Sequence, residues 1–218
     1  MTIPANIPEW KKQKYQMVQS WQTLNRQCSK GQIVFTGSSL MEMFPVEKFA
    51  AEEGPAFPIV YNRGVGGWRT EEMLDCLEEM VITLQPRRVF INIGTNDLSD
   101  ASVTIPALIA RYEAILARIE GAVPGVEIVM MAYYPINYEA AAEGMKPCLR
   151  IRTNERIREA SQAVESLAGR RGHRFINVNA PLTDDQGRLM AAYTIEGMHI
   201  KEEGYRAIWP LVKAEILR

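Results

Sequence analysis

The chain has 218 residues, enough for one domain of ordinary size with a substantial core. Hydrophobic residues make up 47% and charged residues 23%, a balance typical of folded globular proteins and not of disordered or fibrous chains. The formal net charge of −1 offers no positive surface of the kind that binds nucleic acid or anionic lipid, so we expect neither as a partner. No stretch of the chain has the composition of a linker, and residues 1–218 are expected to form a single domain.

The N-terminal segment MTIPANIPEWKKQ has no apolar stretch after a basic start, and no apolar run elsewhere is long enough to cross a bilayer. We therefore expect a cytoplasmic protein without membrane insertion. Cys28, Cys76 and Cys148 lack the spacing of a zinc site or a disulfide framework and are interpreted as small buried side chains. No metal or cofactor is expected, and a homodimer is left open as the assembly state.

The elements can be predicted in chain order. An amphipathic helix is expected over residues 8–27, with the basic residues Lys11, Lys12 and Lys14 on its solvated face. Short runs rich in β-branched residues then predict five strands, at 32–36, 59–62, 88–93, 127–132 and 174–178. Helical periodicity predicts further helices at 70–84, at 105–121 after Thr104 as N-cap, at 147–169 and at 201–217.

Strands and helices alternate, and the strands lack the hydrophobic–polar alternation of a sheet with one solvated face. This pattern indicates a parallel sheet with helices on both sides, a three-layer α/β/α sandwich. Open sheets of this kind bind ligands at the carboxyl ends of their strands, where the strand order reverses. Residues that carry chemistry are therefore expected directly after the strands.

Only two histidines are available as a general base. His173 precedes a strand and is interpreted as structural, because catalytic residues belong at the other strand end. His199 follows the last strand and has Glu196 three residues earlier. If both lie on one helical turn, Glu196 can accept a hydrogen bond from Nδ1 and leave Nε2 for the substrate side. A surface Glu–His pair that caps the last helix is the alternative.

Small polar residues follow the first strand, in the sequence VFTGSSLMEMF. Gly37, Ser38 and Ser39 suit a tight turn that presents a hydroxyl and points a backbone N–H at a carbonyl oxygen. The same composition is common in turns and helix N-caps. It is not the G-x-S-x-G elbow, because Met41 stands where the second glycine would be.

The second and third strands end in loops that can supply hydrogen-bond donors. Glycines in YNRGVGGWRT, at positions 64, 66 and 67, allow a backbone N–H to approach a ligand, while their spacing fits no nucleotide-binding loop. In FINIGTNDLSD, Asn96 offers a side-chain amide of the kind used in oxyanion holes. Thr95 and Asp97 are interpreted as residues that fix the loop, with Asp97 in an Asx-turn or a helix cap.

With these blocks the chain resembles the SGNH/GDSL hydrolase family of esterases and lipases, named for four blocks that contain Ser, Gly, Asn and His. The blocks here, in the family's order, are TGSSL around Ser39, NRGVGG around Gly67, GTND around Asn96 and EGMHIKEEGY around His199. The NRGVGG form is similar to the platelet-activating-factor acetylhydrolase-like and lysophospholipase-like branches. The resemblance implies a flavodoxin-like five-stranded parallel sheet, Ser39 as nucleophile and His199 as base. It also implies an oxyanion hole made by the backbone N–H groups of Ser39 and Gly67 and the amide of Asn96.

Two positions depart from the family pattern. Ser38 replaces the aspartate of Gly-Asp-Ser, and its hydroxyl is expected to make some of the same backbone hydrogen bonds. Glu196 replaces the aspartate of Asp-x-x-His, and its longer arm must fold back to hold the imidazole. If Glu196 turned outward, a backbone carbonyl, Asp184 or Asp185 would be the candidate to orient His199.

The resemblance implies hydrolysis of a carboxylic ester of a small acyl group. A carbohydrate O-acetyl esterase or a thioesterase would use the same residues, and an inactive SGNH-fold binding module is the alternative from another class. Large side chains near the strand ends are expected to wall a substrate pocket, although their spacing is also typical of a core: Met41, Trp68, Tyr134 and Met198. Met43 and Tyr133 are interpreted as core residues.

Overall fold

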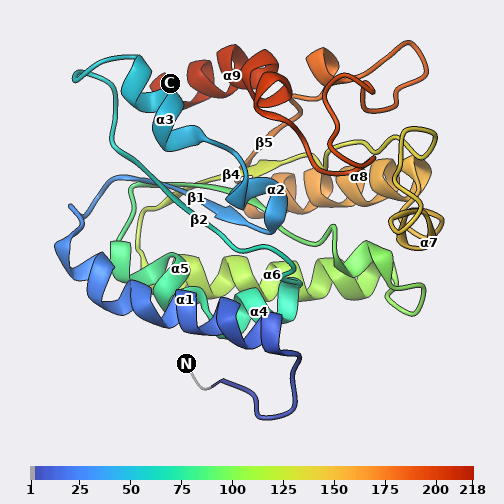
Figure 1. The fold of residues 1–218 in the computed structure, drawn as a ribbon. Helices are drawn as coiled ribbons and strands as arrows, with labels where there is room; N and C mark the ends of the chain where they lie inside the picture. Colours follow the sequence, from blue (N-terminus) through green and yellow to red (C-terminus); the bar gives the residue numbers. More distant parts are fainter. Residues whose placement is uncertain (1–2) are drawn as a thin grey trace.

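The computed structural model describes residues 3–218; residues 1 and 2, part of the expected single domain, lie outside the described part. At its centre is a parallel sheet of five strands in the order β2-β1-β3-β4-β5 (Figure 1). The strands are β1 (Ile33–Gly37), β2 (Val60–Gly64), β3 (Arg88–Asn92), β4 (Glu127–Met131) and β5 (Arg174–Ile176). This order is that of flavodoxin-like doubly wound sheets, and the predicted fold class is confirmed.

Helices cover both faces of the sheet, with α1, α5 and α6 on one side and α3 and α9 on the other (Figure 1). The α-helices are α1 (Glu9–Gln27), α2 (Ser39–Glu42), α3 (Val46–Glu52), α4 (Thr70–Asp75), α5 (Leu77–Met80), α6 (Ile105–Ala122), α7 (Lys146–Leu149), α8 (Asn154–Arg171) and α9 (Glu202–Leu217). Short 3-10 turns are η1 (Ile82–Leu84), η2 (Asp97–Ser99) and η3 (Ala180–Leu182).

Alternate side chains of the central strands enter two separate hydrophobic clusters. Val89 and Ile91 of β3 pack with α1, α5, α6 and α8, whereas Phe90 packs with α3 and α9 on the opposite face. Phe90 also stacks on Phe35 of the neighbouring strand, with ring centroids 4.3 Å apart. The strands are therefore buried on both faces, which explains why their sequences show continuous apolar runs.

Two helices predicted as continuous are broken. The predicted helix at 70–84 consists of α4, α5 and η1, because Cys76 and Val81 leave helical geometry. The predicted helix at 147–169 is interrupted before Thr153, whose hydroxyl accepts from the backbone N–H of Arg156 at 3.2 Å and starts α8 as its N-cap. By contrast, Thr104 caps α6 as expected and accepts from Ala107 at 3.3 Å.

The basic residues of α1 do not simply face solvent. Lys11 forms an ion pair with Glu72 of α4, and Lys14 forms one with Glu42 of α2 at 2.6 Å. These pairs attach the N-terminal half of α1 to two elements that follow β1 and β2. The expectation of a purely solvated face is therefore wrong for Lys11 and Lys14.

Two expectations about the chain as a whole can be compared with the structure. No helix among residues 3–218 is both long and apolar enough to span a bilayer. Of the three cysteines, Cys76 is buried as expected, while Cys28 and Cys148 are only half-buried.

Candidate active site

Four loops meet at the carboxyl edge of the sheet, beside the point where the strand order reverses. Ser39 begins α2 directly after β1, Gly67 follows β2, Asn96 follows β3, and His199 lies in the loop before α9. All four residues are half-buried, so they are partly open to solvent. The four residues predicted from sequence therefore lie together at the edge where open α/β sheets bind their ligands.

Ser39, His199 and Glu196 form a continuous hydrogen-bonded chain. Nε2 of His199 lies 2.9 Å from Oγ of Ser39, and Nδ1 lies 2.6 Å from Oε1 of Glu196. A carboxylate can only accept, so Nδ1 carries the hydrogen and Nε2 is left to accept from the serine hydroxyl. This is the arrangement that a nucleophile, its base and an orienting acid require.

The segment around Glu196 is an irregular loop and not the expected helical turn. The carboxylate folds back, so that Oε1 also accepts from the backbone N–H of His199 at 3.2 Å. Thr194 closes the loop: its hydroxyl accepts from Gly197 at 2.8 Å and donates to the carbonyl of His199 at 3.1 Å. Gly197 has φ +99°, and a Cβ there would lie 2.6 Å from Ala141, so only glycine fits.

Three N–H groups are available to bind an oxyanion beside Ser39. Within residues 3–218, the backbone N–H groups of Ser39 and Gly67 donate to no protein acceptor. Nδ2 of Asn96 donates one hydrogen to the carbonyl of Trp68 at 2.9 Å, which leaves its second hydrogen. This hydrogen bond attaches the amide to the loop that carries Gly67. It fixes the position of Nδ2 of Asn96 relative to the backbone N–H of Gly67.

The loop that carries Gly67 is held from α1 and α2. Glu42, one turn after Ser39, accepts from the backbone N–H of Gly66 at 2.9 Å and pairs with Lys14. Gly67 has φ +82°, and a Cβ at this position would lie 2.7 Å from Cζ3 of Trp10. The ring of Trp10 therefore lies against Gly67 while the residue stays 52% exposed.

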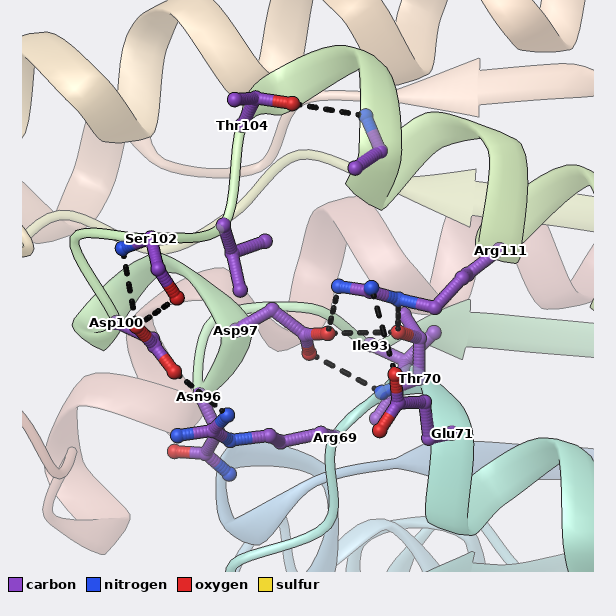
Figure 2. Close-up of polar contacts among 12 residues, drawn as sticks. Arg69, Thr70, Glu71, Ile93, Asn96, Asp97, Asp100, Ser102, Thr104 and Arg111 are labelled. Carbon is purple, nitrogen blue, oxygen red and sulfur yellow. Dashed lines mark hydrogen bonds and ion pairs between the residues drawn. The ribbon is translucent and has the colours of Figure 1, made fainter.

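A buried polar network joins the loops after β2 and β3 (Figure 2). Asp97 accepts from the backbone N–H of Thr70 at 3.1 Å and from its hydroxyl at 2.6 Å. Arg111 of α6 completes the network by donating to Asp97 at 3.1 Å and to the Thr70 hydroxyl at 2.9 Å. Asp97 is thus a helix cap, as interpreted from sequence, but for α4 and not for its own turn. It connects the segment of Gly67 to the segment of Asn96.

The two departures from the family pattern have different outcomes. Ser38 is fully buried, and its Oγ lies 3.4 Å from the Thr95 hydroxyl, so its contact is with a side chain and not with the backbone as expected. Glu196 does fold back onto His199, as its longer arm requires. Asp184 holds its own turn and Arg188 instead.

The large side chains expected in a pocket are placed mainly in the core. Met41, Trp68 and Tyr134 are at most 2% exposed, so a substrate has no surface of these side chains to contact. Met198, next to His199, is also buried. Their strand-end positions are as expected, but they pack inward, because the layers on both faces of the sheet extend to its edge.

The residues interpreted as structural differ in their burial and in their position. Tyr133 is buried as expected, with its hydroxyl donating to the carbonyl of Ile93 at 2.7 Å. Met43 is 39% exposed, so its interpretation as a core residue is wrong. His173 lies near β5, where Nε2 is 2.6 Å from Glu120, away from the strand ends that carry the site.

Three hollows of the molecule do not include Ser39 or His199 in their lining. Cavities of about 350, 620 and 430 Å³ are lined by residues other than Ser39, His199, Gly67 and Asn96. Over the described range 3–218, no three His, Cys, Asp or Glu side chains gather in an arrangement that could hold a metal ion.

The sequence reasoning missed the residues that hold the loops in place from other elements. Trp10, Lys14 and Glu42 contact the loop of Gly67, and Arg111 contacts Asp97. None of these contacts follows from spacing along the chain. Only Glu42 could have been identified from the sequence, because it lies three residues after Ser39 and hence on the same side of a short helix.

Comparisons with known proteins agree with this geometry. The chain matches the model of the GDSL-like lipase/acylhydrolase family over residues 44–207, a range that begins after Ser39. A search of curated proteins finds no match. A solved structure from Streptococcus pneumonia, described as a platelet activating factor, is 28% identical, with a TM-score of 0.83 and coverage of 94% of this chain and 93% of that one.

Two further solved structures share the fold. A GDSL-like lipase from Bacteroides thetaiotaomicron is 22% identical, with a TM-score of 0.74 and coverage of 92% of this chain and 97% of that one. An acetylxylan esterase from Geobacillus stearothermophilus is 17% identical, with a TM-score of 0.66 and coverage of 86% and 95%. The chain therefore belongs to the GDSL-like lipase/acylhydrolase family, also called SGNH/GDSL hydrolases, and is a hydrolase.

Proposed function

We propose that the protein is a serine esterase that cleaves carboxylic esters of small acyl groups. The observation that carries the proposal is the position of His199, whose imidazole lies 2.9 Å from the hydroxyl of Ser39 and 2.6 Å from the carboxylate of Glu196. Ser39 is the nucleophile, His199 is the base and Glu196 orients the base. Membership of the acylhydrolase family supports the same class of reaction.

In the first half of the reaction, Ser39 Oγ attacks the acyl carbon and its proton passes to Nε2 of His199. Glu196 stabilises the imidazolium that forms. The carbonyl oxygen becomes an oxyanion and accepts from the N–H groups of Ser39 and Gly67 and from Nδ2 of Asn96. His199 then gives the proton to the leaving alcohol, and the acyl group stays on Ser39.

In the second half, water attacks the acyl group on Ser39 while His199 accepts its proton. The same three donors bind the second oxyanion. Collapse of this intermediate releases the carboxylic acid and returns the hydroxyl of Ser39. A thioester would follow the same steps with a thiol as leaving group, so the thioesterase alternative is decided by substrate and not by mechanism.

The preference for a small acyl group is supported by the packing around the triad. Met41 and Tyr134, which would wall a deep apolar pocket, are buried in the core. Three hollows of several hundred Å³ are lined by residues other than Ser39 and His199. A long acyl chain would therefore find no deep pocket walled by Met41 and Tyr134, so its burial would contribute little to binding.

A series of p-nitrophenyl esters from acetate to palmitate tests this proposal. We expect the highest kcat/KM on acetate or propionate and a steady fall with chain length. Asn96→Ala should lower kcat on the order of 10²- to 10³-fold, the cost of one oxyanion donor. A protein that is folded but inactive on every ester of the series would instead be the inactive SGNH-fold binding module.

A carbohydrate O-acetyl ester is the second candidate substrate, and Trp10 is the observation in its favour. The ring lies against Gly67 and remains 52% exposed, so a flat apolar surface borders a proposed oxyanion donor. Such a surface is suited to pack on the face of a sugar ring in the alcohol part of the ester. The acetylxylan esterase from Geobacillus stearothermophilus has the same fold.

Trp10→Ala tests this second candidate on two acetate esters. We expect KM to rise about fivefold to tenfold on an acetylated xylo-oligosaccharide, the effect of one lost ring contact, with little change on ethyl acetate. Leu24→Ala, at an exposed position near the other end of α1, is the matched control. Equal effects on both esters would reject a role of Trp10 in binding sugar.

A further inference from the structure

A buried arginine lies directly behind the proposed oxyanion hole. Arg152 is 3% exposed and precedes Thr153, the N-cap of α8. Its guanidinium donates to Oδ1 of Asn96 at 2.9 Å and to the hydroxyl of Ser99 at 2.8 Å. A third contact is with the sulfur of Met198, the residue before His199. Arg152 therefore contacts both the loop after β3 and the loop of the base.

The charge of Arg152 has no carboxylate partner. Among residues 3–218, no aspartate or glutamate forms an ion pair with it. Asp97, the residue after Asn96, already accepts hydrogen bonds from Thr70 and Arg111. Burying a cation without a carboxylate beside it costs folding free energy, and the hydrogen bonds of Arg152 to Asn96 and Ser99 offset part of that cost.

The hydrogen-bond partners of Asn96 explain what Arg152 does. The guanidinium can only donate, so it fixes Oδ1 of Asn96 on its own side. The carbonyl of Trp68 can only accept, so it fixes Nδ2 on the other side. Together they leave one orientation of the amide, in which a single N–H is free for the substrate.

We propose that Arg152 is a positioning residue of the oxyanion hole, which fixes and polarises the Asn96 amide so that its free N–H meets the developing negative charge. The inference rests on the proposed esterase mechanism. A cation bound to the amide oxygen draws electron density from the nitrogen and strengthens the N–H as a donor.

The guanidinium stays charged under the conditions in which an esterase works. Burial lowers the pKa of Arg152 to about 10, while the negative charge of Asp97 acts in the opposite direction. At neutral pH the group is still protonated. The polarising charge is therefore present throughout the reaction.

A double-mutant cycle between Arg152→Met and Asn96→Ala tests the inference, with kcat and KM measured on p-nitrophenyl acetate. Methionine keeps the length of the side chain and removes its charge and donors. We expect Arg152→Met to lower kcat about tenfold to a hundredfold with KM changed less than about threefold, part of the cost of a whole oxyanion donor. In the Asn96→Ala background the same change should lower kcat less than about threefold, because Arg152 acts through the amide.

Arg158→Met is the matched control, since it removes the same charge from an exposed position of α8 and should leave kcat unchanged. If the losses from Arg152→Met and Asn96→Ala multiply, or if Arg152→Met leaves kcat unchanged, the inference is overturned. A merely structural role of Arg152 would lower the unfolding temperature without coupling to Asn96 in kcat.

Arg152→Lys serves if the methionine variant does not fold. Lysine keeps the charge and loses the planar set of donors, so we expect a smaller fall in kcat that again disappears in the Asn96→Ala background. A fall that persists there overturns the inference. Failure of the proposed function gives a different result, because the wild-type protein would then hydrolyse no ester at all.

Discussion

At the scale of single residues, Glu196 is the group that departs most from the family pattern and still meets its partner. Its carboxylate lies 2.6 Å from Nδ1 of His199 because the loop, closed by Thr194 and Gly197, brings the longer side chain back. The spacing of three residues between Glu196 and His199 predicted their contact. The irregular shape of the loop was not predictable from that spacing, since it depends on a tertiary contact of Gly197 with Ala141.

Replacing Glu196 with glutamine should lower kcat on the order of 10³- to 10⁴-fold with little change in fold. The amide can donate to Nδ1 and so favours the tautomer whose Nε2 carries a hydrogen and cannot act as base. Steady-state kinetics on p-nitrophenyl acetate provide the measurement, and Glu203→Gln on the exposed start of α9 is the control. Activity within about threefold of wild type would show that another group orients His199.

At the scale of elements, the site depends on contacts between segments far apart in the sequence. Asp97 joins the loop after β3 to the first turn of α4, and Lys14 and Glu42 join α1 to α2 (Figure 2 shows the Asp97 network). The sequence predicted the strand ends, the cap at Thr104 and the chemistry of each loop from local patterns. It did not predict these contacts, because a pairing across 27 or 28 positions leaves no periodic signal.

Asp97→Asn should destabilise the protein by about 1–3 kcal/mol, the cost of leaving buried hydrogen-bonding groups without a matching partner. The amide nitrogen would face the donors of Thr70 or Arg111, and the positive charge of Arg111 would lose its buried partner. Urea denaturation gives the free energy of unfolding. Asp100→Asn, at a more exposed site in the same loop, should have a much smaller effect. Equal losses for the two variants would argue against a network that holds the loops together.

At the scale of the whole molecule, two hydrophobic clusters hold helices on the two faces of one sheet. The continuous apolar runs predicted this arrangement, because parallel strands are buried on both faces. The same burial explains why Met41, Trp68 and Tyr134 lie in the core and not in the expected pocket wall. An apolar residue at a strand end has the same sequence pattern whether it lines a pocket or fills the core, and here the core extends to the edge.

Phe90→Ala should lower the free energy of unfolding by about 3–5 kcal/mol, since the substitution opens a cavity in the middle of the sheet. Phe90 is fully buried and stacks on Phe35, so the surroundings have little freedom to collapse into the space. Leu211→Ala, at a residue 45% exposed on α9, should change it by less than about 0.5 kcal/mol. Denaturant unfolding compares the two, and similar losses would contradict the layered core described above.

In the proposed mechanism, Ser39 is a nucleophile activated by His199. Incubation with a fluorophosphonate probe, followed by mass spectrometry of the intact protein and its peptides, tests it most directly. We expect one probe per chain, attached to Ser39, with labelling abolished in Ser39→Ala and slowed at least about a hundredfold in His199→Ala. A folded protein that takes no probe, or that is labelled at another residue, would show that Ser39 is not an activated nucleophile.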